Sequence, residues 1–221
     1  MLKARPMAGD LALGHQFVDM VSPLVWQAGG QPNFMTEIQA MRKRVISLIP
    51  AREKNREIKL GAGGLRDVEF TVQLLQLVHG RADSRLRNRG TFAALEALIS
   101  FGYVGRADGA ELDREYRFQR LLEHRMQLAK LRRTHLMPED PAEGRRLARS
   151  VGLRDDVEVQ AAWRESSQTV LRLHSRMFYS PLLEAVARIP SEHVRLSADA
   201  AETWLTALGY NDAKAALRHI Q

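Results

Sequence analysis

The chain contains no cysteine among its 221 residues. This absence excludes disulfide frameworks, cysteine-ligated zinc, iron–sulfur clusters and thiol catalysis, and it makes a reducing cytoplasm the simplest setting. No stretch approaches the roughly 18 consecutive apolar residues of a membrane-spanning helix. The residues after Met1 do not form the apolar core of a secretory signal peptide. We therefore expect a cytoplasmic protein with no contact to a membrane.

Acidic residues are outnumbered, with 26 Asp and Glu against 33 Lys and Arg, for a net charge of +7. This balance favours an acidic partner. Arginines gather in two groups, Arg81, Arg85, Arg87 and Arg89, and then Arg125, Arg132 and Arg133. The interleaved aromatic residues of a single-strand binder are missing. The sequence therefore indicates a solvated or protein-facing basic surface rather than a nucleic-acid interface.

Apolar residues recur at helical spacing almost everywhere, and no stretch alternates long enough to predict a sheet. The predicted fold is all-α, a multi-helix bundle-like domain. Asp10 is predicted to cap a first helix that ends at Gly29, with Leu13, Phe17, Val21, Leu24 and Val25 on its apolar face. The other helices are predicted at about 33–49, 64–79, 91–102, 110–133, 142–150, 156–179 and 182–189.

The composition changes after Pro190, where Ser197 precedes an alanine-rich helix that contains Trp204. We expect residues 1–190 to form the helical domain. Residues 191–221 are predicted to form a short helical appendage.

The most informative window runs from Lys59 to Phe70, with the sequence KLGAGGLRDVEF. Its glycines directly precede a predicted helix, where free backbone amides can hold an anion. The spacing matches neither a dinucleotide-binding fingerprint nor a P-loop. Candidate residues for phosphate, nucleotide or domain contact are Lys59, Gly63, Gly64, Arg66, Asp67 and Glu69.

Asp67 and Glu69 resemble the paired carboxylates that hold two metal ions in nucleotidyl transfer. On a helix, however, residues two apart point about 200° away from each other, so this pair cannot share a metal. We expect Asp67 to interact favourably with the helix dipole, and Arg66 and Glu69 to join a buried polar network. No metal ligand and no catalytic residue is assigned.

A second polar set, Arg120, Glu123, His124 and Gln127, lies on the long predicted helix at 110–133. Glu123 and His124 are adjacent, so their side chains do not face each other for general-base catalysis. No histidine pair has HxxxH or HExxH spacing, and a structural histidine is the preferred interpretation. This face is expected to pair with the glycine-rich segment.

Arg66 and Glu69 are three residues apart, so they can pair with each other or with residues 123–127. We favour the second pairing as a clamp. Removing one partner of such a desolvated pair would cost about 3–5 kcal/mol.

Three segments carry a resemblance to a known family, namely Lys3–Asp10, Lys59–Phe70 and Glu123–Gln127. They resemble the bifunctional glutamine synthetase adenylyltransferase/adenylyl-removing enzymes, of the actinobacterial type. In that family each half has a nucleotidyltransferase domain followed by a helical domain related to that of PII-uridylyltransferases. The chain resembles the helical part alone, because no Gly-Ser dipeptide and no Asp-x-Asp occurs in it. Ala62 stands where many relatives have proline.

The resemblance implies that Met1 lies inside a longer enzyme, and that the segment after Tyr179 leads from the first, adenylyl-removing half toward a central regulatory region. It implies AMP transfer from ATP to a tyrosine of glutamine synthetase with Mg²⁺, and removal of AMP by phosphorolysis. Implied partners are glutamine synthetase, a PII-type signal protein and the enzyme's own nucleotidyltransferase and regulatory domains. For this chain alone no cofactor and no activity are expected. The alternative hypothesis is a stand-alone helical module whose basic face binds an acidic protein.

Overall fold

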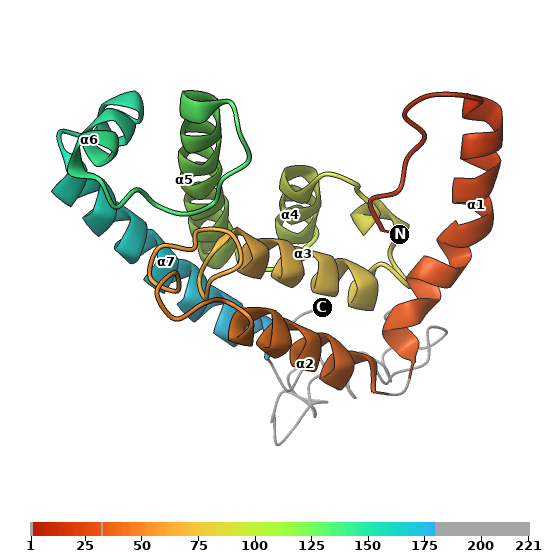
Figure 1. The fold of residues 1–221 in the computed structure, drawn as a ribbon. Coiled ribbons are helices and arrows are strands. Elements are labelled where there is room, and N and C mark those ends of the chain that lie inside the picture. The colour runs from red at the N-terminus through yellow and green to blue at the C-terminus, as the bar shows by residue number, and fades with distance from the viewer. Residues whose placement is uncertain (1, 32, 180–221) are drawn as a thin grey trace, which may run out of the picture. The chain divides into compact units, whose positions relative to one another are not determined.

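The fold consists of helices joined by turns, as predicted (Figure 1). A computed structural model describes residues 2–31 and 33–179. Within these residues the chain forms seven α-helices and two short 3₁₀ turns, with no strand apart from an isolated bridge between Glu57 and Leu136. The all-α prediction is confirmed. The predicted helices at 182–189 and 191–221, and the boundary at residue 190, lie outside the described residues.

The helices are α1 (Leu11–Gln27), α2 (Phe34–Ser47), α3 (Leu65–His79), α4 (Thr91–Ser100), α5 (Arg106–Lys130), α6 (Pro141–Ser150) and α7 (Asp156–Phe178). Local sequence signals set most of these bounds. Asp10 accepts a hydrogen bond from the Leu13 amide and begins α1. Asp140 does the same for α6, where Pro141 is the first helical residue.

The longest helix differs from its prediction at both ends. Helix α5 begins at Arg106 rather than near Ala110. The predicted start was too late because the first turn of the helix is polar and carries no apolar repeat. It ends at Lys130 rather than Arg133, since Leu131 adopts a left-handed conformation with φ of 48° and is exposed. A leucine that was expected on the apolar face therefore lies outside the helix.

The described residues divide into two compact units, and the chain passes between them within α2, within α3, between α4 and α5, and directly after α7. One unit holds the described residues of Met1–Ile38 and Gln73–Tyr103, and the other holds Gln39–Val72 and Val104–Phe178. In the first unit α1 has an exposed apolar face, with Leu13, Phe17 and Leu24 exposed and Trp26 buried. The predicted helix is thus present, but its apolar face is largely exposed, and the buried residue of α1 lies in the last turn.

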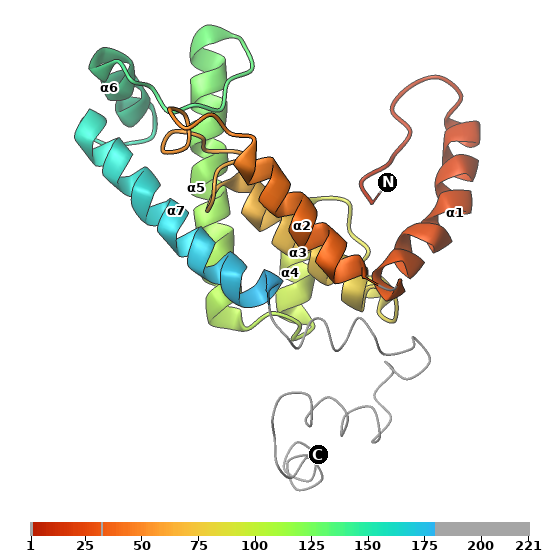
Figure 2. The same ribbon diagram turned by 60° about the horizontal axis from the view of Figure 1, so that its bottom comes forward.

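The second unit contains every candidate site residue. Helices α5, α6 and α7 pack on one another, and α6 lies beside the C-terminal end of α5 and the N-terminal part of α7 (Figures 1 and 2). Its core includes Leu65, Leu112, Leu122 and Leu173, all fully buried. No helix within residues 2–31 and 33–179 is both long enough and apolar enough to cross a membrane.

Candidate functional site

The glycine-rich segment forms a tight turn at the start of α3. A Cβ atom at Gly61 would overlap the Glu57 carbonyl oxygen, and one at Gly64 would lie within 2.6 Å of the Ile58 carbonyl oxygen. Gly63 has a φ of +73°, and its Cβ would overlap the backbone of Ser167 on α7. These glycines are required because the turn packs directly against other backbone.

The amides from Gly63 to Asp67, at the start of α3, are already used. The Gly63 amide donates to Asp67 Oδ2 at 2.6 Å, and the Leu65 and Arg66 amides donate to the carbonyl oxygens of Ile58 and Lys59. The amides of Gly64 and Asp67 also have backbone acceptors. An anion at the start of α3 would have to displace these bonds. The arrangement therefore favours a packing role for Gly63 and Gly64 over phosphate binding.

Asp67 lies at the centre of a buried cluster that sequence reasoning did not find. Its Oδ1 accepts a 2.5 Å hydrogen bond from Arg42 Nε, and the exposed fractions of the two side chains are 1% and 0%. Arg42 also donates to the carbonyl oxygens of Leu60 and Gly61, at 2.9 Å each. Arg42 thus joins α2, the glycine turn and α3. The available signal was its place on the apolar stripe of α2, between Ile38 and Val45.

His174 on α7 completes this cluster. Its Nδ1 lies 2.8 Å from Thr71 Oγ, and its Nε2 lies 3.4 Å from Asp67 Oδ1. The Thr71 hydroxyl donates to the Asp67 carbonyl oxygen, so the Thr71 oxygen is left to accept a hydrogen bond from His174 Nδ1. Burial lowers the pKa of His174, although the negative charge of Asp67 acts in the opposite direction. The cluster is a structural connection among α2, α3 and α7.

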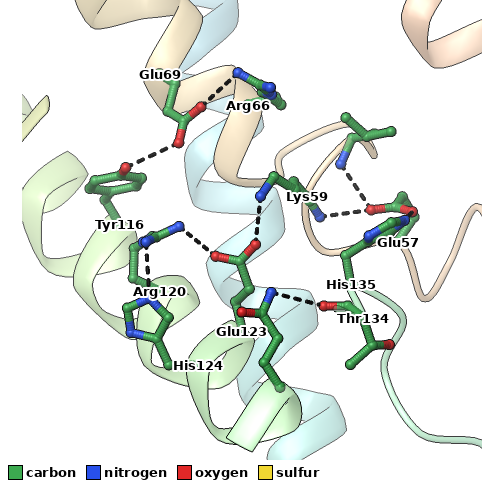
Figure 3. A network of polar contacts seen from close by, with 12 residues as sticks. Glu57, Lys59, Arg66, Glu69, Tyr116, Arg120, Glu123, His124, Thr134 and His135 are labelled. Atoms are coloured by element: carbon green, nitrogen blue, oxygen red, sulfur yellow. Dashed lines mark hydrogen bonds and ion pairs between the residues drawn. The ribbon is translucent and has the colours of Figure 1, made fainter. Parts of the chain in front are cut away.

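A second network lies between the glycine turn and α5 (Figure 3). Lys59 Nζ donates to Glu123 Oε1 at 2.8 Å, and Arg120 Nη1 donates to Glu123 Oε2 at 2.5 Å. Arg120 Nη2 also donates to Nε2 of His124 at 2.9 Å. The structure thus brings Lys59, Arg120, Glu123 and His124 together. His124 itself is exposed, so it does not serve as a buried packing residue.

Glu57 holds the loop before the turn. Its Oε1 accepts the amides of Lys59 and Leu60 at 2.9 Å each, and its Oε2 lies 3.1 Å from His135 Nε2. This buried carboxylate was also missed, because nothing in the local sequence distinguishes it from the other charged residues of the segment 52–57. Gln127 lies one turn farther along α5 and donates to the Thr134 carbonyl oxygen at 3.2 Å.

The preferred clamp between Arg66 and residues 123–127 is wrong. Arg66 pairs with Glu69 instead, at 3.0 Å, and Glu69 accepts a hydrogen bond from Tyr116 on α5 at 3.2 Å. Lys59 is the residue that reaches Glu123. The side chain of Arg66 is 41% exposed and that of Glu69 is 12% exposed, so Arg66 is not part of a desolvated network.

This geometry predicts unequal effects of two substitutions. Arg66→Ala should lower the free energy of unfolding by less than about 1 kcal/mol, because its ion pair is largely solvated. Glu123→Gln should lower it by about 1.5–3 kcal/mol, because it weakens two charge-assisted hydrogen bonds at a buried carboxylate. Urea denaturation of the 221-residue chain measures both values, and equal losses would contradict the arrangement.

Asp67 and Glu69 take separate partners, in agreement with the helical geometry. Arg42 and the Gly63 amide occupy the oxygens of Asp67, whereas Arg66 and Tyr116 occupy those of Glu69. Among the residues that the structure describes, no group of three or more His, Asp or Glu side chains is placed to hold a metal ion. Asp67 and Glu69 therefore do not converge on one point as a pair of Mg²⁺ ligands would.

The two arginine groups have different surroundings. In the first, Arg85 pairs with Asp83 at 2.6 Å and lies over the Phe101 ring, while Arg87 donates to the Gly80 carbonyl oxygen. Hydrogen bonding from Arg85 lowers the pKa of Asp83 to about 2. In the second group Arg125, Arg132 and Arg133 are exposed.

Comparison with known proteins assigns the family. A family model described as GlnD PII-uridylyltransferase matches residues 39–178, which include the glycine turn, the buried cluster and the α5 network. The chain belongs to this family. The first and last residues that the family model matches, 39 and 178, are also the first and last residues of the second unit.

Three curated relatives that align with the whole chain have the same name. A bifunctional glutamine synthetase adenylyltransferase/adenylyl-removing enzyme from Cutibacterium acnes is 59% identical over 221 residues, and one from Streptomyces avermitilis is 56% identical over 223 residues. The Corynebacterium glutamicum enzyme of that name is 48% identical over 228 residues. In each case the alignment covers 100% of this chain and 22% of the relative. The resemblance stated from the sequence motifs is confirmed.

Proposed function

We propose that this chain is a helical module of an enzyme that adenylylates glutamine synthetase and removes the adenylyl group. The observation that carries the proposal is the 59% identity along the whole chain to a protein with that name. The chain spans 22% of the length of this relative. In this proposal the longer enzyme carries out the chemistry. It transfers AMP from ATP with Mg²⁺, removes AMP by phosphorolysis to give ADP, and is regulated by a PII-type protein.

The module belongs to the adenylyl-removing half, as the resemblance implies, and its role is positional. The described residues offer a packed turn and side-chain networks rather than a metal or phosphate site. Lys59, Arg66 and Arg120 are partly exposed beside the turn, with exposed side-chain fractions of 20%, 41% and 30%. This surface, defined by Lys59, Arg66 and Arg120, is the contact for the enzyme's own nucleotidyltransferase domain.

The proposal predicts that the purified chain has no activity of its own. With adenylylated glutamine synthetase, phosphate and Mg²⁺ it should release no ADP above background, because two-metal catalysis needs carboxylates that hold ions about 3.5–4 Å apart. A full-length relative, assayed in parallel, is the positive control. Phosphorolysis by the purified chain would contradict the prediction.

The gene upstream of this chain distinguishes the module from a stand-alone binding protein. The proposal expects a Gly-Ser turn followed by Asp-x-Asp on a predicted strand, within about one domain length of about 100–200 residues. Its absence would favour the alternative of an independent module with a basic face.

A further inference from the structure

A cavity of about 620 Å³ lies beside the glycine turn, within the second unit, and Asp67 is not among its lining residues. The end of α2, the loop that precedes the turn, and α7 form its walls. Three of its lining residues are cations, Lys54, Arg56 and Arg164, and none is an aspartate or glutamate. Its volume falls within the range of about 300–1,000 Å³ that is typical of small-molecule sites.

Two of these positive charges are not compensated. Arg56 pairs with Glu139 and donates to the Met137 carbonyl oxygen. Lys54 and Arg164 are exposed, and neither forms an ion pair or a side-chain hydrogen bond with any residue in the described part of the chain. Glu53, the acid next to Lys54 in the sequence, is within 3.5 Å of Arg52 instead. The cavity therefore carries a local excess of about two positive charges.

The rest of the lining is apolar or uncharged. Ile46, Ile49 and Trp163 contribute apolar surface, and three carboxamide side chains contribute hydrogen-bonding groups. The turn itself provides Gly61 and Ala62, and the Ser167 hydroxyl holds this wall by donating to the Ala62 carbonyl oxygen at 3.0 Å. Cations beside an apolar wall with a few amides match an anion that also carries a planar or apolar group.

We propose that this cavity binds a phosphorylated small molecule with a planar group, of which a nucleoside diphosphate is the simplest example. Its phosphates lie between Lys54 and Arg164, and its ring packs on the apolar wall, where Ile46 is the more exposed residue. None of the residues that form the Lys59–Glu123 network lines the cavity, so this is a second site. The proposal does not rest on the proposed function, because it concerns binding by this chain alone.

Isothermal titration of the 221-residue chain with ADP at low ionic strength tests the proposal. Arg164→Ala and Lys54→Ala should each weaken ADP binding by about tenfold or more, because each removes a charge-assisted contact to phosphate. Arg149→Ala is the matched control, since Arg149 is exposed on α6 and does not line the cavity. Raising the salt concentration should weaken binding by the intact chain.

Pyrophosphate and inorganic phosphate serve as further probes. ADP should bind more tightly than either, because only ADP contacts the apolar wall. Equal affinity for ADP and pyrophosphate would overturn the role of that wall, and the absence of ADP binding would overturn the site. ADP binding that Arg164→Ala leaves unchanged, or that Arg149→Ala weakens equally, would also overturn it. Melting curves check each variant, and Arg164→Gln or Lys54→Gln replaces the alanine variant of the same residue if that variant does not fold.

Discussion

Replacing Arg42 by methionine should lower the free energy of unfolding by about 3–5 kcal/mol, because it leaves a buried carboxylate without its cation. Arg42 is fully buried, and its three donors hold Asp67, Leu60 and Gly61. Methionine preserves much of the side-chain volume, so the loss reports the charge and hydrogen bonds rather than a cavity. Urea denaturation monitored by circular dichroism gives the value.

Arg44→Met on the same helix is the control. Arg44 is exposed, and the same substitution there should change the free energy of unfolding by less than about 0.5 kcal/mol. A double-mutant cycle with Asp67→Asn isolates the pair, and its coupling energy should lie within about 0.5–3 kcal/mol. Additive effects of the two substitutions would show that Arg42 and Asp67 do not interact as the structure indicates.

Replacing Gly63 by alanine should lower the free energy of unfolding by about 2–5 kcal/mol, the sum of a left-handed backbone penalty and a steric one. Gly63 has a φ of +73°, and an added Cβ would overlap the backbone carbonyl of Ser167. The substitution must therefore move the glycine turn or α7. We expect the same variant to lose the hydrogen bond that the amide of residue 63 donates to Asp67 Oδ2. The amide proton of residue 63 should then exchange faster with solvent.

Gly152→Ala separates these two contributions. Gly152 has a φ of +82°, but no atom lies within 4 Å of the position that a Cβ would take. Its substitution carries the backbone penalty alone and should cost about 1–2 kcal/mol. If Gly152→Ala and Gly63→Ala cost the same, the close approach of the turn to α7 contributes nothing, and the steric argument fails.

Much of the helical architecture followed from signals that act within a few residues. Asp10 caps α1, Thr91 begins α4, and α3 ends at His79 directly before Gly80. Such signals are readable because a cap or a helix breaker acts on the backbone beside it. The family was also readable, since its motif at residues 59–70 is contiguous.

The partners of charged side chains were not readable in this way. Arg66 and Lys59 both stand near the turn, yet Lys59 reaches Glu123 while Arg66 pairs with Glu69. The helical spacing of Arg66 and Glu69 allowed either outcome, because it specifies one face of α3 and says nothing of which residue of α5 lies opposite. The correct pairing depends on the loop at residues 57–60, which Glu57 holds in place.

The sequence by itself determined that this chain is helical, where most of its helices begin and end, and which family it belongs to. Only the tertiary structure decided that Arg42 is the buried partner of Asp67, 25 residues away, and that the amides from Gly63 to Asp67 are occupied. It alone placed Lys54 and Arg164 on one cavity. The physical reason is that hydrophobic periodicity and capping are local, whereas burial, ion pairing and cavities arise when distant segments pack together.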